Sequence, residues 1–113
     1  MNIIVTNCAR QGDVLVLRRD SIPATATEKL RDPRGVVLAE GEVTGHHHRI
    51  KDPRVCALRA EGVHWDMLRI TDGIIGRLQH EEHAEIAIGA GAYEVRIQRE
   101  YDWASEASRA VAD

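Results

Sequence analysis

The chain has 113 residues and a formal net charge of -3, with 29% charged and 43% hydrophobic residues. A typical domain has about 100–150 residues, so we expect residues 1–113 to form a single domain. No apolar run approaches the roughly 18–20 residues that span a bilayer, and the first residues lack the basic region of a secretory signal. We therefore expect a cytoplasmic protein that has no membrane segment.

Charge and cysteine content exclude two further classes. The 15 Lys and Arg residues and 18 Asp and Glu residues are spread along the chain without a basic stripe, so we expect no nucleic-acid partner. The two cysteines, Cys8 and Cys56, are far apart and show no paired spacing. This pattern indicates reduced thiols, since a disulfide scaffold or a thiolate zinc site needs closely spaced cysteines.

Residue types and turn positions predict a chain made mostly of strands. Ile and Val greatly outnumber Leu, and branched side chains fit a pleated sheet better than a helix. Gly- and Pro-containing turns separate the apolar runs at short intervals. The predicted strands are Ile3–Asn7, Asp13–Arg19, Gly35–Val43, Gly45–Ile50, Val55–Ala60, Val63–Ile70, Ile74–His80, Glu85–Ile88 and Tyr93–Tyr101.

Strands of this number and length predict an all-β fold, a small antiparallel barrel or sandwich. Two segments depart from the strand pattern. Residues 20–34 are polar and predict a long loop, with one helical turn at Thr27–Arg31. Residues 102–111 predict a short C-terminal helix, with Asp102 as N-cap and an Ala-rich body.

Histidine is the unusual residue type, because the chain has six histidines and no Phe. Three of them, His46, His47 and His48, lie in a predicted strand. There, His46 and His48 project from one face, while His47 projects from the other. Two imidazoles on one face of a strand can converge on one metal ion.

A second cluster, His80-Glu81-Glu82-His83, lies where the Ile74–His80 strand ends. It differs from the helical metalloprotease motif, in which the histidines are four residues apart. We predict a site for a divalent transition metal, with zinc first and nickel, copper or iron as alternatives. The predicted ligands are His46, His48 and His83, with His80 as substitute, and Glu82 or Glu81 is the candidate base.

Two other interpretations of these histidines stay open. Three adjacent histidines also occur at a polar hairpin edge, and an HEEH run also occurs in a solvated acidic turn. The histidines can also form a hydrogen-bonded, titrating cluster that holds no metal.

The sequence resembles a set of small, functionally uncharacterised proteins encoded in bacterial and phage genomes. The resemblance covers most of the chain and implies no established activity. It is carried by four segments, namely Arg10–Leu15 (RQGDVL), Gly41–His48 (GEVTGHHH), His80–His83 (HEEH) and Gly91–Tyr101 (GAYEVRIQREY).

Two functions from different classes are compatible with these features. The first is a metal-binding β protein, with cupin-like, metal-dependent catalysis on a small molecule if a coordination position stays open. The comparison with cupins is one of architecture alone. The second is a non-catalytic structural or adaptor module, phage-associated, whose histidines lie at a subunit interface. Self-association is expected in both cases, because small β modules often complete their cores by association.

Overall fold

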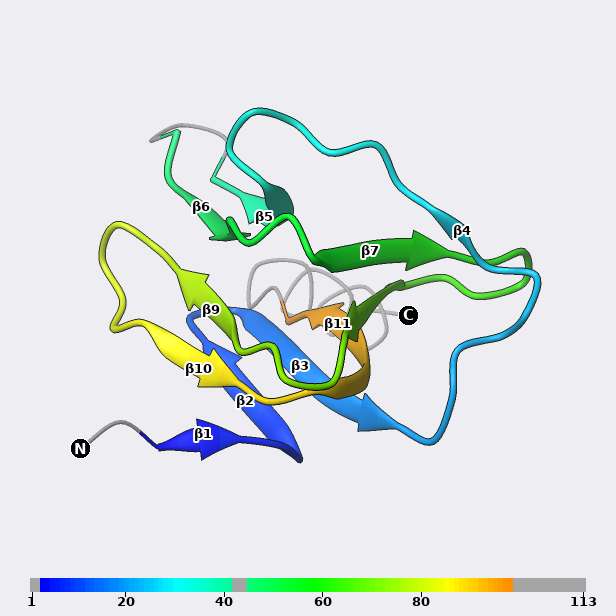
Figure 1. Cartoon of the computed structure of the whole chain (residues 1–113). Coiled ribbons are helices and arrows are strands. Elements are labelled where there is room, and N and C mark those ends of the chain that lie inside the picture. The colour runs from blue at the N-terminus through cyan, green and yellow to red at the C-terminus, as the bar shows by residue number, and fades with distance from the viewer. Residues whose placement is uncertain (1–2, 42–44, 99–113) are drawn as a thin grey trace, which may run out of the picture.

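A computed structural model describes residues 3–41 and 45–98 and shows two β-sheets (Figure 1). The first sheet has the order β1-β10-β9-β6-β5 and lies at the left of the view, and the second has the order β2-β3-β11-β8-β7-β4. The strands are β1 (Ile4–Val5), β2 (Cys8–Gln11), β3 (Val14–Arg19), β4 (Thr27–Glu28), β5 (Val36–Glu40), β6 (His47–Ile50), β7 (Val55–Arg59), β8 (Asp66–Ile70), β9 (Gly76–Gln79), β10 (Ile86–Ile88) and β11 (Gly91–Ile97).

The all-β prediction is confirmed, and the choice between barrel and sandwich is settled against a closed barrel. Each sheet ends in edge strands, β1 and β5 in one and β2 and β4 in the other, so the fold is sandwich-like. Strand pairing is antiparallel except between β1 and β10, which run parallel. The parallel pair corrects the expectation of an entirely antiparallel structure.

Residues 20–34 contain one short strand that the sequence did not predict. Thr27 and Glu28 form β4, which pairs with Arg59 and Leu58 of β7. The helical turn predicted at Thr27–Arg31 is therefore wrong, because the backbone there is extended against a sheet edge. The polar sequence gave no sign of this strand, since both of its side chains are exposed and neither is apolar.

The helix predicted at residues 102–111 lies outside the described residues. Within residues 3–41 and 45–98 there is no helix, and hence none long and apolar enough to span a bilayer.

The core is mostly aliphatic and lies between the two sheets. Strand β6 shows the alternation that builds it, because His48 and Ile50 point inward while His47 and Arg49 lie on the outer face. The core takes side chains from both sheets, among them Val14, Val16, Val36, Ile50, Val55, Leu68, Ile70, Leu78, Ile88, Tyr93 and Val95.

A two-residue turn joins β2 to β3 and brings the second sheet against the first. Gln11 pairs with Val14, which leaves Gly12 and Asp13 at the tip. Gly12 has a φ of 60°. A positive φ at the first turn position is typical of a type II′ hairpin, which reserves this place for glycine. This tip, called the Gly12–Asp13 turn below, lies beside the histidines.

The Asp66 carboxylate ties β8 to its neighbours in the second sheet. Its side chain is 14% exposed. Lys29 Nζ lies 2.5 Å from Oδ2, and Arg59 Nη2 lies 2.6 Å from Oδ1. Burial alone raises the pKa of Asp66, but the hydrogen bonds from Lys29 and Arg59 outweigh it, so the pKa is lowered from 3.8.

We predict that Asp66→Asn lowers the free energy of unfolding by about 1 kcal/mol at pH 7. The folded-state pKa of Asp66 lies below its unfolded value, so the stabilisation is complete above about pH 4 and is lost as the pH falls through the folded pKa. Urea unfolding between pH 3 and 7 will therefore show a smaller acid-induced loss in Asp66→Asn than in the wild type. The exposed Asp72 provides the control variant, Asp72→Asn. Parallel pH curves for Asp66→Asn and the wild type would refute the prediction.

Candidate metal centre

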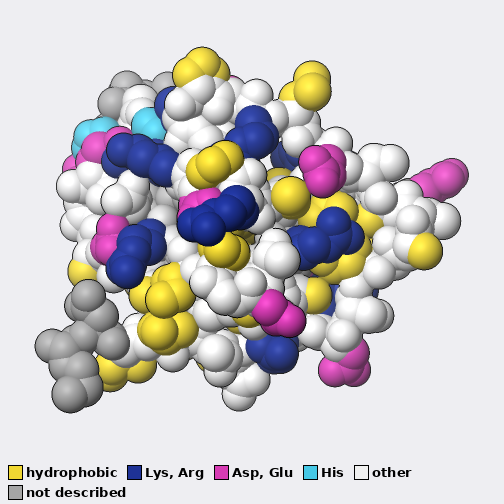
Figure 2. Space-filling model, in the orientation of Figure 1, with side chains coloured by type: hydrophobic (Ala, Val, Ile, Leu, Met, Phe, Trp, Pro, Cys, Tyr) yellow, Lys and Arg dark blue, Asp and Glu magenta, His cyan; other side chains and the backbone are white. Residues whose placement is uncertain are grey.

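Four histidines meet at the seam between the two sheets. His46 precedes β6, His48 lies within it, and His80 and His83 follow β9; we call these four the histidine cluster. The register aligns Arg49 with Gln79, so the start of β6 and the end of β9 are neighbours. In Figure 2 the histidines appear beside carboxylates at the upper left, where β6 begins in Figure 1.

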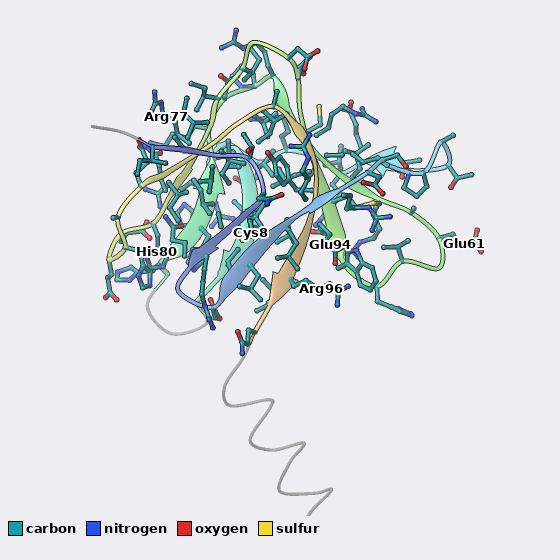
Figure 3. The ribbon with its side chains drawn as sticks, turned by 90° about the horizontal axis from the view of Figure 1, so that it is seen from below. Cys8, Glu61, Arg77, His80, Glu94 and Arg96 are labelled. Carbon is teal, nitrogen blue, oxygen red and sulfur yellow. The ribbon has the colours of Figure 1, made fainter. Side chains whose placement is uncertain are left out.

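The four imidazole rings are in close contact around His80. The centroid of its ring is 4.2 Å from that of His48, 4.7 Å from that of His83 and 5.8 Å from that of His46. His48 and His83 are stacked, with centroids 5.9 Å apart. The structure thus brings together all four predicted ligands. Figure 3 shows His80 at the margin of the molecule, remote from Glu94 and Arg96.

Gln11, at the end of β2, holds the cluster from the inside. Its side chain is buried, with 2% of the residue exposed. Nε2 donates hydrogen bonds to Leu78 O at 3.0 Å and to Ala84 O at 2.9 Å, the residues that flank the HEEH segment. Oε1 lies 2.9 Å from Nδ1 of His48. One amide therefore joins β2, β6 and both ends of the β9–β10 connection.

These hydrogen bonds fix the proton on His48. Carbonyl oxygens only accept, so the amide nitrogen of Gln11 must face Leu78 and Ala84, and its oxygen must face His48. Nδ1 of His48 then donates, which leaves Nε2 with a lone pair. This Nε2 atom lies 3.5 Å from Oδ1 of Asp13, which belongs to the Gly12–Asp13 turn. Two electron-pair acceptors therefore face each other.

Burial favours the neutral imidazole at two rings of the cluster, those of His48 and His80. His48 is 5% exposed. Burial lowers the pKa of His48 to about 4, and the imidazole of His80 adds to the shift. The pKa of His80 is also lowered, first by burial and then by His83. Neutral imidazole is the form that binds transition metals, so the folded protein presents these rings in the ligand form.

The two glutamates of the HEEH segment have different surroundings. Glu81 accepts hydrogen bonds from His47 N at 2.9 Å and from Arg49 Nη1 at 2.8 Å. The hydrogen bond from His47 is the main cause that lowers the pKa of Glu81 to about 2. Glu82 is 67% exposed, with Oε1 3.3 Å from Nδ1 of His46. These contacts favour a positioning role for Glu81, while a base role for either residue stays a prediction.

His80 is the least suited of the four predicted ligands in this conformation. The backbone N–H of Glu82 donates to its Nδ1 at 3.0 Å. The proton of neutral His80 therefore resides on Nε2. Ligation through either nitrogen requires this hydrogen bond to be given up.

Sequence reasoning found the histidines but missed two of their partners, Gln11 and Asp13. Both lie in the Arg10–Leu15 segment, which supported a resemblance but received no role. A local signal was present, because Gly12 and Asp13 between two apolar runs indicate a hairpin tip. The sequence does not show which strand ends lie beside this tip, because that depends on the long-range topology of the sheets.

A comparison with protein-family models matches residues 10–98 to a domain of unknown function, DUF8820. The chain belongs to the DUF8820 family. The matched region contains the whole histidine cluster together with Gln11 and Asp13. Comparisons of the chain with curated proteins and with solved structures gave no match.

We predict that metal-free wild-type protein at pH 7 carries the proton of His48 on Nδ1. Nitrogen-15 NMR of the imidazole groups distinguishes a protonated from an unprotonated ring nitrogen and measures this directly. Gln11→Met keeps the side-chain length but removes the donors to Leu78 O and Ala84 O and the acceptor for His48 Nδ1, so it should cost about 2–4 kcal/mol of unfolding free energy.

Gln79→Met is the matched control for Gln11→Met. Gln79 Nε2 donates to the exposed Glu85 carboxylate, so its loss should cost less than about 1 kcal/mol. A proton found on Nε2 of His48, or equal costs for the two variants, would contradict the arrangement at Gln11.

Gly12→Ala should displace His83. A Cβ at this position would stand 2.8 Å from Nε2 of His83, and the φ of 60° adds backbone strain. We expect a loss of about 1–3 kcal/mol and a change in the imidazole resonances of His83. Gly62→Ala has similar strain, with φ 81° and nothing within 4 Å of the added Cβ. A loss no greater than that of Gly62→Ala would show that the ring contact is unimportant.

Proposed function

We propose that this DUF8820 domain binds a divalent transition-metal ion, zinc in the first place, between His48 and Asp13. The observation that carries the proposal is the 3.5 Å separation of the His48 Nε2 lone pair from the Asp13 carboxylate. While His48 is neutral and its proton is held at Nδ1 by Gln11, no hydrogen bond can join these two atoms. A cation between them replaces this unfavourable contact with two favourable ones, one to Nε2 of His48 and one to Oδ1 of Asp13.

The spacing of the two atoms suits a tetrahedral ion. Ligands bound to zinc at about 2.0–2.1 Å lie roughly 3.3 Å apart when the coordination is tetrahedral. The observed 3.5 Å between Nε2 and Oδ1 is close to that value. Little side-chain movement is therefore needed for both to bind one ion.

The third ligand we propose is His83, whose ring must move to reach the ion, because the ligand atoms of Asp13, His48 and His83 do not all lie within 4.8 Å of one another. Its Nε2 atom would lie 2.8 Å from a Cβ placed on Gly12, and Cε1 of His48 would lie 3.3 Å from the same point. Both rings thus lie against the Gly12–Asp13 turn. Two imidazoles and one carboxylate suit zinc, and nickel, copper and iron accept the same set.

Gln11 supplies the outer support that such sites generally have. A metal-ligating histidine usually donates its other ring N–H to a carbonyl or carboxylate, which sets the tautomer and the ring orientation. Gln11 provides this acceptor for His48. Its two bonds to β9 and to the following connection keep the amide from rotating.

The alternative function places the histidines at a subunit interface. Burial of His48 within its own chain argues against that function for this ring, because a buried ring is not available to a second subunit. The test below separates the two functions by measuring metal content and molecular size on the same samples.

We expect untagged, purified protein to retain zinc at one or more ions per chain by elemental mass spectrometry. His48→Ala should lower zinc affinity at least 100-fold, and Gln11→Met about 10–100-fold. Zinc at a free concentration 100 times Kd should raise the unfolding free energy by about 2.7 kcal/mol.

His64→Ala provides the control, since His64 is exposed and lies outside the histidine cluster. Its zinc affinity should equal that of the wild type. Absence of retained or added zinc in the wild type, with unchanged stability of His48→Ala, would exclude the metal function. Zinc binding accompanied by loss of an oligomer on chelation would favour the interface function.

A further inference from the structure

The side chains around the histidine cluster exceed what one ion takes. Zinc in a protein site has four ligands, and some of these positions are often filled by water. Besides the four histidines, three carboxylates lie in ion-pair contact with histidines, those of Asp13, Glu81 and Glu82. One ion between His48 and Asp13 leaves several of these groups unused.

Some of the groups that this first ion does not bind lie close to one another. The donor atoms of His46, His80 and Glu81 all lie within 4.8 Å of one another. Glu82 adjoins this set, because its Oε1 is 3.3 Å from Nδ1 of His46. Neither Asp13 nor His48 belongs to that group.

The three carboxylates differ in their ion-pair partners. Glu81 has a cationic partner, Arg49, at 2.8 Å. For Asp13 and Glu82, by contrast, the ion pairs within residues 3–41 and 45–98 are with histidines, His48 and His46 respectively. Two histidine–carboxylate pairs of 3.5 and 3.3 Å thus occur in one cluster.

His80 lies between the two pairs. Its ring centroid is 4.2 Å from that of His48 and 5.8 Å from that of His46. Nδ1 of His80 accepts the Glu82 N–H, so this ring already has a partner within the protein. It can therefore lie between the two pairs without being a ligand of either ion. Both pairs also have the separation expected of two ligands on one tetrahedral ion.

From this arrangement we propose that the domain binds a second divalent transition-metal ion, held by His46 and Glu82 with Glu81 beside them. The inference rests on the proposed function, since it adds a second ion to the same cluster. Exposure sets the order of binding. His48 is almost buried, whereas the side chains of His46 and Glu82 are 32% and 67% exposed, so the second ion binds more weakly.

Zinc titration of untagged, metal-free protein, followed by native mass spectrometry, tests the number of ions. We expect two ions per chain, with the second at least tenfold weaker than the first. Asp13→Asn and Glu82→Gln should each retain one ion, and the double variant none. Glu85→Gln is the matched control, because Glu85 is exposed and pairs with Arg77 outside the cluster, and it should retain two.

Imidazole NMR during the same titration assigns the ions to places. The first equivalent should shift the resonances of His48 and His83, and the second those of His46. A single ion per chain, weakened by both Asp13→Asn and Glu82→Gln, would overturn the second site and leave the proposed function standing. Two ions retained by Glu82→Gln would also overturn it. An absence of any zinc binding in the wild type would remove the proposed function itself.

Discussion

The buried amide of Gln11 is the interaction on which the candidate site depends. Its two N–H groups are committed to Leu78 O and Ala84 O, so the carbonyl oxygen alone remains for His48. A glutamate at this position would lack both donors, and an apolar residue would lack all three hydrogen bonds. The same amide therefore holds the two sheets together, fixes the ends of the HEEH segment and decides which nitrogen of His48 bears a proton.

The environment of His48 distinguishes between the interpretations that the sequence left open. A polar hairpin edge would leave the histidines in water, but His48 is buried and its pKa is lowered to about 4, mainly by that burial. A hydrogen-bonded cluster without metal accounts for Nδ1, which Gln11 satisfies. In the neutral ring, which the lowered pKa favours at pH 7, it leaves Nε2 facing the Asp13 carboxylate with no proton to donate. Of the three interpretations, metal binding gives both ring nitrogens of His48 a favourable partner.

Local patterns in the sequence predicted the all-β class and most strands, because alternation and Gly-rich turns are local features. They missed β2, the strand that carries Gln11, and β4, whose two residues are exposed and are extended only because β7 lies beside them. The histidines were recognisable from spacing along β6 and in the HEEH segment. Gln11 and Asp13 were not, since their role arises from a second-sheet hairpin meeting the first sheet, with 67 residues between Gln11 and Leu78. Tertiary contacts of that range have no signature in a single sequence.

The position of the cluster at the seam between the sheets links metal binding to folding. Asp13 comes from a hairpin of the second sheet, while His48 and His83 come from β6 and the β9–β10 connection of the first. An unfolded chain does not bring these three segments together, so the proposed ion would bind the folded state preferentially, and its binding free energy would stabilise that state. The domain needs such help more than a larger one does, because a chain of about 100 residues buries a limited fraction of its surface. An ion between His48 and Asp13 would thus act as a cross-link between the sheets as well as a chemical centre.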